Sequence, residues 1–258
     1  MIKLDIRSDD DDVRRQREVV AIRVLSYFEG RLPDLKLLCL LDDVDWEFLK
    51  SPDCAGKANR GVFIRTRDGV RIWPEWQGWP DYLKELVCVV DSESCKPNYV
   101  FDCLIYVHGR TCATGVGLTM TLAHEIQHFC QYGSQRKLWA ANTLLSNLPK
   151  MASVRITPWE LPFEQDARIA SKSAAEHLCG KEIVREYIDT KVGDAFGESE
   201  RGDWRFVQQL TTPLPYDLFV ETRRTLQRFA EYRPELRSII EQLQDDVDFR
   251  GFDLDEFC

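Results

Sequence analysis

Two histidines, His124 and His128, lie four positions apart in residues 115–133, GVGLTMTLAHEIQHFCQYG. Residues four apart on a helix share one face, so both imidazoles can reach a single metal ion. Glu125 is one step further round the helix, where its carboxylate can contact a water on that ion. The His-Glu-x-x-His spacing therefore predicts a zinc site in which Glu125 acts on a water molecule.

The apolar character of the segment supports this interpretation. The chain has only 4 histidines, and two of them stand with a glutamate in a nearly apolar helix. Burying such groups is costly unless they have partners, and a metal ion is a suitable partner. The alternative is a pair of core histidines with other hydrogen-bonding partners and Glu125 at the surface.

A catalytic zinc usually takes three protein ligands and one water, so a third ligand is needed. Residues 157–180 offer Glu160 and Glu164. A capping box that starts at Thr157 explains Glu160. Glu164 lies one turn before Ala167, on a stripe of small residues along which another helix can approach closely. We therefore expect Glu164 to be the third ligand; its other interpretation is a first-turn acid favoured by the helix dipole.

The elements that position these residues are segregated along the chain. An acidic run at residues 9–12 predicts a helix start, residues 61–73 predict a hairpin around an Asp-Gly turn, and residues 99–109 predict a strand. From residue 115 onward the pattern is helical. This order predicts an α+β fold with a small, mostly antiparallel sheet. We expect one domain over residues 1–258, with residues 9–50 as a candidate accessory helical region.

Composition narrows the class of protein. The chain has 258 residues and a formal net charge of -9, which would repel a phosphate backbone, so nucleic acid is not expected as a partner. No apolar run approaches the length of about 20 residues that spans a bilayer, and the N-terminus does not have the pattern of a signal peptide. The 9 cysteines are scattered, as is typical of reduced thiols. We expect a cytoplasmic protein that does not bind membranes.

The segment HEIQHFCQ, followed by PFEQDA, resembles the gluzincin pattern of zinc metallopeptidases over roughly residues 99–180. The resemblance implies a zincin-like fold, one Zn²⁺ held by His124, His128 and Glu164, and Glu125 as general base. It also implies an edge strand, residues 99–108, that pairs with an extended substrate. Arg168 departs from the pattern, because relatives of the thermolysin type carry at that position an acid that orients the first histidine.

These observations predict a zinc-dependent metallopeptidase, an endopeptidase that acts on a protein or peptide. The zinc lowers the pKa of its water toward ~7, and Glu125 takes the proton and passes it to the leaving amine. A hydrolase acting on a non-peptide amide is a further possibility. The rival class is an inactive or metal-stabilised zincin-like scaffold that binds a protein partner. The motif is complete, which favours the enzyme.

Overall fold

The computed structural model describes residues 1–43, 61–65, 88–90, 97–109, 112–151, 160–195, 197–212, 216–231 and 237. The chain divides into two compact units, Met1–Phe129 and Cys130–Cys258, and the boundary falls within one helix. The second strand of the predicted hairpin and the predicted capping residue Thr157 lie outside the described residues. Within the described part, no helix is both long enough and apolar enough to cross a membrane.

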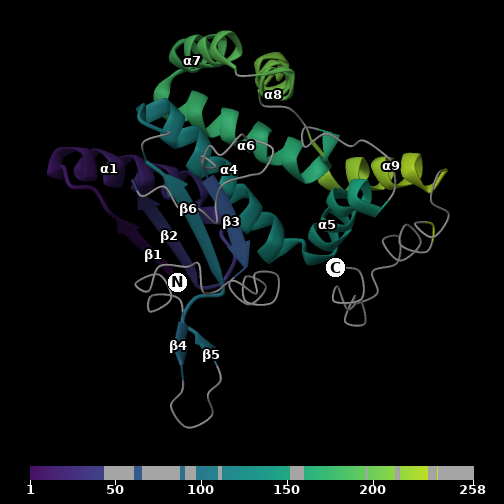
Figure 1. Ribbon diagram of the computed structural model, residues 1–258, viewed down its shortest axis with the longest axis horizontal. Coiled ribbons are helices and arrows are strands. Elements are labelled where there is room, and N and C mark those ends of the chain that lie inside the picture. The colour runs from purple at the N-terminus through teal and green to yellow at the C-terminus, as the bar shows by residue number, and fades with distance from the viewer. Residues whose placement is uncertain are drawn as a thin grey trace. The chain divides into compact units, whose positions relative to one another are not determined.

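The first unit is built on a four-stranded sheet with the order β1-β2-β6-β3 (Figure 1). Pairs β1–β2 and β2–β6 are parallel, and β3–β6 is antiparallel. A separate antiparallel pair joins β4 to β5. The elements of this unit are β1 (Ile2–Ile6), α1 (Asp11–Phe28), the 3-10 turn η1 (Glu29–Arg31), β2 (Leu37–Asp42), β3 (Gly61–Arg65), β4 (Cys88–Val90), β5 (Pro97–Tyr99), β6 (Cys103–His108) and the greater part of α4 (Gly115–Ser134).

Local sequence explains the main elements of this unit. Helix α1 begins where the acidic run predicts, because the Asp10 carboxylate accepts backbone N–H bonds from Asp12 at 2.8 Å and Val13 at 3.2 Å. Strands β2 and β6 read LLCLLD and CLIYVH, and every residue in them is buried. Continuous apolar runs are typical of strands covered on both faces of a sheet. These two strands therefore form the core of the first unit.

The α+β prediction is confirmed, but the sheet is mixed rather than mostly antiparallel. Two of its three pairings are parallel. For β1 and β2 the reason is that α1 is a crossover that returns the chain in the same direction. The candidate helical region 9–50 contains the buried strand β2. The predicted edge strand is also wrong: β6 lies between β2 and β3, so both of its sides are paired.

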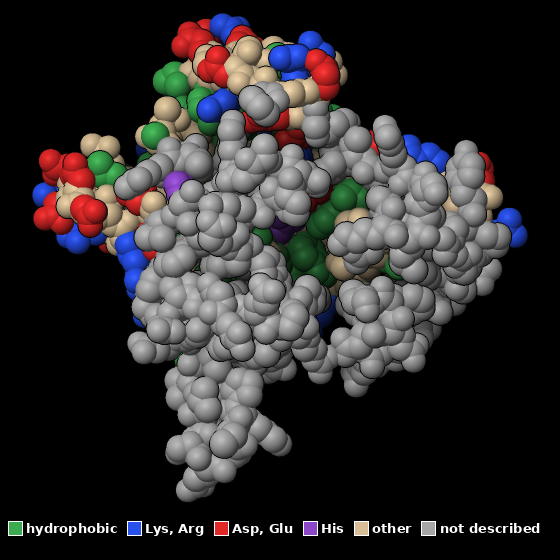
Figure 2. Space-filling view, in the orientation of Figure 1, with side chains coloured by type: hydrophobic (Ala, Val, Ile, Leu, Met, Phe, Trp, Pro, Cys, Tyr) green, Lys and Arg blue, Asp and Glu red, His purple; other side chains and the backbone are tan. Residues whose placement is uncertain are grey.

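The second unit is helical. Its further helices are α5 (Arg136–Met151), α6 (Pro162–Cys179), α7 (Lys181–Asp194), α8 (Glu198–Gln209) and α9 (Leu218–Ala230). Buried leucine and phenylalanine side chains of α5, α6 and α9 form one apolar cluster. Helix α6 gives way to α7 at Gly180, whose φ of 95° favours glycine. On the outer surface of α7 and α8, acidic and basic side chains alternate (Figure 2).

Candidate metal centre

The two histidines of α4 face each other. Their Nε2 atoms are 3.1 Å apart, and the rings are nearly perpendicular with centroids 4.6 Å apart. Two nitrogens that share a tetrahedral zinc at ordinary bond lengths are about 3.3 Å apart. The observed separation therefore suits one shared ion. A hydrogen bond between the two rings would give a similar separation. A third ligand near both nitrogens is therefore needed to distinguish a metal site from a hydrogen-bonded pair of histidines.

Glu164 supplies that third group from the first turn of α6. One ligand atom from each of His124, His128 and Glu164 lies within 4.8 Å of the others, and no other such metal-ligand group occurs among the described residues. Two imidazole nitrogens and one carboxylate oxygen are a donor set typical of a catalytic zinc. Glu160 precedes α6, which begins at Pro162, and does not belong to this group. His124, His128 and Glu164 are therefore a group that could hold a metal ion.

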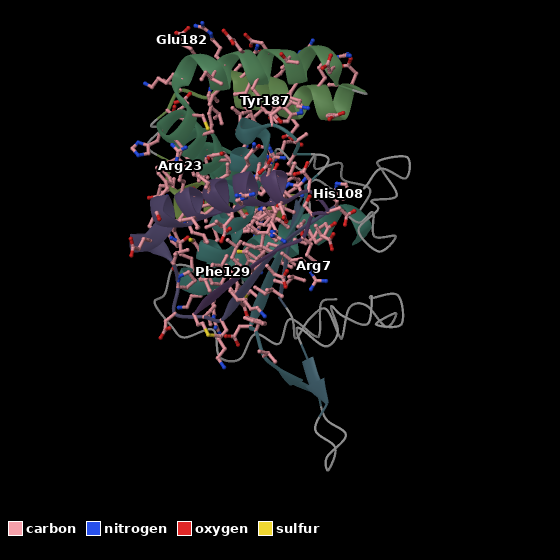
Figure 3. The ribbon with its side chains drawn as sticks, turned by 90° about the vertical axis from the view of Figure 1, so that its left-hand side faces the viewer. Arg7, Arg23, His108, Phe129, Glu182 and Tyr187 are labelled. Carbon is pink, nitrogen blue, oxygen red and sulfur yellow. The ribbon has the colours of Figure 1, made fainter. Side chains whose placement is uncertain are left out.

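The apolar side of α4 holds the histidines in place within the first unit. Leu122, Ile126 and Phe129 are fully buried. The ring of Phe129, labelled in Figure 3, lies 6.3 Å from the ring of Phe63 on β3. Burial of these large side chains is the main source of stability at such a contact. Packing on the sheet therefore sets the rotation of α4, and with it the direction of His124 and His128.

Glu125 lies against the start of β3. Its side chain is buried, with 6% exposure. A Cβ atom built on Gly61 would be 2.7 Å from Thr121 Cγ2, closer than real Cβ atoms approach, and a tight 3.0 Å from Glu125 Oε1. A larger residue here would require these two side chains to move, so the glycine leaves room for Glu125 in its observed position. Sequence reasoning recognised the strand but missed the role of Gly61, which depends on a contact with a helix distant in the sequence.

A polar side chain from α4 holds the turn that carries Glu164. Gln131, which is 3% exposed, donates through Nε2 to the Phe163 carbonyl at 2.9 Å and to the Asp166 carboxylate at 2.7 Å. These two acceptors flank Glu164 in the sequence. Gln131 follows His128 by less than one helical turn on α4. The same helix therefore carries two candidate ligands, and Gln131 on it holds the turn that bears the third candidate.

Two further side chains hold this turn. Leu161 at the N-cap of α6 has no polar side chain, and the buried Asn142 of α5 accepts the Phe163 N–H at 3.2 Å instead. The Tyr216 hydroxyl donates to the Pro162 carbonyl at 3.1 Å, and burial, followed by the charge of Asp166, raises the pKa of that phenol. Sequence reasoning missed these residues; a glutamine near the end of the largely apolar α4 segment, Gln131, was the one available signal.

An ion pair lies beside the Glu164 carboxylate. Arg168 donates from Nη1 to Glu164 Oε2 at 2.8 Å, and its Nε donates to the carboxylate of Asp203 on α8. Burial opposes the charge of Arg168, but the charges of Glu164 and Asp203 outweigh this effect and raise the pKa of Arg168. Arg168 is the residue that departs from the gluzincin pattern. It contacts Glu164 rather than a histidine.

A hydrolytic site also needs a donor to the oxygen that becomes negatively charged in the reaction, and three polar residues with donor groups take different positions. His108 ends the central strand β6 and is paired in register with Asp42; Figure 3 shows it toward the same end of the sheet as Arg7. Tyr132 stacks edge-on against Trp139. His177 is exposed near the end of α6, about 20 Å along the helix from Glu164. His177 is therefore excluded as a donor near Glu164.

Comparison of the chain with protein-family models, with curated proteins and with solved structures finds no match in any of the three.

Proposed function

We propose that this protein is a zinc-dependent metallopeptidase, an endopeptidase with a zincin-like fold. The observation that carries the proposal is the convergence of ligand atoms from His124, His128 and Glu164, with Glu125 on the same helix as the two histidines. A structural histidine pair would not require a carboxylate from another helix at the same point. A catalytic zinc site requires both the third ligand and an adjacent general base.

The chemistry divides between the ion and the chain. A bound zinc ion supplies Lewis-acid chemistry, which polarises a scissile carbonyl and makes an attacking water more acidic. Glu125 accepts the proton of that water on its carboxylate and then donates it to the leaving amine nitrogen. A Cβ atom at position 61 would lie 3.0 Å from Glu125 Oε1 and 3.1 Å from Glu125 Cγ, so the glycine leaves the carboxylate the space that it occupies beside β3.

The sheet suggests how a peptide substrate binds. Strand β3 pairs with β6 along one side, and its other side pairs with no strand among the described residues. An extended peptide can add to such an edge through backbone hydrogen bonds. Because β3 starts against Glu125, a peptide on that edge would pass near the general base. We therefore propose β3, in place of residues 99–108, as the strand that receives the substrate.

Metal content and hydrolysis of fluorogenic peptides test the proposal together. The purified protein should contain close to one zinc, and His128→Ala should lose it. Glu125→Gln keeps the size of the side chain but removes the base, so metal should remain while hydrolysis falls at least ~100-fold.

Full zinc stoichiometry in His128→Ala would overturn the ligand assignment. Unchanged turnover in Glu125→Gln would overturn the role of Glu125. Zinc binding without hydrolysis by the unmodified protein would favour the metal-stabilised scaffold that binds a protein partner.

A further inference from the structure

Arg168 contacts the third ligand and is itself held in place. Its Nη1 donates to Glu164 Oε2 at 2.8 Å and to the Glu164 carbonyl at 3.2 Å. Its Nε donates to the Asp203 carboxylate. The Arg168 side chain is 12% exposed. The guanidinium is planar, so the contact with Asp203 also restricts the direction in which Nη1 points.

This arrangement orients the Glu164 carboxylate. Its Oε2 accepts a charge-assisted hydrogen bond from Arg168, which restricts rotation of the carboxylate. We propose that Arg168, held by Asp203, is a positioning residue that orients the Glu164 carboxylate as a metal ligand. The inference rests on the proposed metal centre and adds the device that holds its third ligand.

The alternative is that Arg168 has a purely structural role and only joins α6 to α8. The chain offers a control residue, Lys172, that joins the same two helices. Lys172 lies one turn after Arg168 on α6 and is 8% exposed. Its Nζ donates to the carbonyls of Val207, at 3.0 Å, and Leu210 at the end of α8. Both basic residues therefore join the same two helices. In these contacts only Arg168 donates to the Glu164 carboxylate.

The charge of Arg168 and the geometry of its guanidinium can be tested separately. If Arg168 acted only through its positive charge, a lysine at this position would replace it. If it acts by orienting the carboxylate, lysine fails, because a single ammonium cannot donate to Glu164 and Asp203 in the fixed geometry of a guanidinium. Arg168→Lys therefore separates a charge effect from a positioning effect.

The test is the zinc affinity of the full chain, measured by competition with a chelator of known affinity, with the unfolding midpoint of each metal-free variant as a check on folding. Arg168→Gln should weaken zinc binding about 10–100-fold, as loss of a group that orients a metal ligand does. Arg168→Lys should weaken it in the same direction. Lys172→Met should lower the unfolding midpoint and leave zinc affinity within about twofold.

Cobalt(II) provides a second readout that does not depend on activity. Its visible absorption reports ligand geometry, so the spectrum of Arg168→Gln should differ from that of the unmodified protein, and the spectrum of Lys172→Met should not. Equal loss of affinity in Arg168→Gln and Lys172→Met, or unchanged affinity in Arg168→Gln, would overturn the positioning role. Failure of the unmodified protein to bind zinc would instead overturn the metal centre itself.

Discussion

Replacement of Gln131 by methionine tests whether the buried glutamine fixes the turn that carries Glu164. Methionine keeps the length and most of the volume of the side chain but removes the amide that donates to Phe163 and Asp166 at 2.9 and 2.7 Å. A neutral hydrogen bond contributes ~0.5–1.5 kcal/mol and one to a charged group ~1.5–3 kcal/mol. Asp166 is half-buried, so in the variant water can replace part of its lost hydrogen bond. We therefore expect the free energy of unfolding to fall by about 2–3 kcal/mol.

Urea unfolding of the metal-free protein measures this loss, and a thermal midpoint lower by roughly 4–12 °C should accompany it. Gln208→Met is the matched control. Gln208 also donates its amide to an aspartate, Asp189, at 2.7 Å, but on the exposed surface, where water replaces the bond. The control should therefore cost less than about 0.5 kcal/mol.

Zinc affinity should separate the two variants as well. Loss of the Gln131 contacts frees the turn on both sides of Glu164, so zinc binding should weaken about 10-fold or more in Gln131→Met and stay unchanged in Gln208→Met. Equal destabilisation of the two variants would show that the buried contacts add nothing to stability. An unchanged zinc affinity in Gln131→Met would refute the link between this contact and Glu164.

Two further predictions concern the carboxylates near α6 and a buried thiol. Glu164→Gln should weaken zinc binding strongly, because it removes a proposed ligand and an anionic charge. Glu160→Gln should keep the metal and lower the free energy of unfolding by at most about 1 kcal/mol. Loss of zinc in Glu160→Gln but not in Glu164→Gln, measured by zinc titration, would show that the wrong carboxylate was assigned as the third ligand. Burial raises the pKa of the Cys39 thiol from 9.0 to about 12. Only the unfolded chain then loses this proton between those values, so Cys39 should contribute a loss of stability of up to about 1.4 kcal/mol per pH unit as pH rises above 9. Cys39→Ala should remove that contribution from urea unfolding measured at successive pH values, and identical slopes would contradict it.

Local sequence determined the elements that bear the chemistry. The four-residue spacing of His124 and His128 requires a shared face wherever the segment is helical, and the segment is helical. The acidic run begins α1, and the glycine at position 180 ends α6. Both act through contacts within a few residues. Such features are predictable because they depend on the nearest turn of the chain.

The pairing of the strands could not be predicted in the same way. Strand β6 is an apolar run that suits an edge or a centre, and its neighbours β2 and β3 come from distant parts of the sequence. The direction of β2 depends on a crossover through α1. Burial on both faces identifies a central strand only once the sheet is assembled.

The surroundings of the candidate ligands were decided by tertiary structure alone. Gln131 and Asp166 are 35 residues apart, as are Arg168 and Asp203. Periodicity shows which face of a helix is apolar but not which polar groups of another helix meet it. Sequence spacing thus selected His124, His128 and Glu164. The Glu164 carboxylate accepts a bond from Arg168 of the same helix. Its surroundings depend on packing between helices, because Asp203, which holds Arg168, and Gln131, which holds the turn, come into reach only in the folded chain.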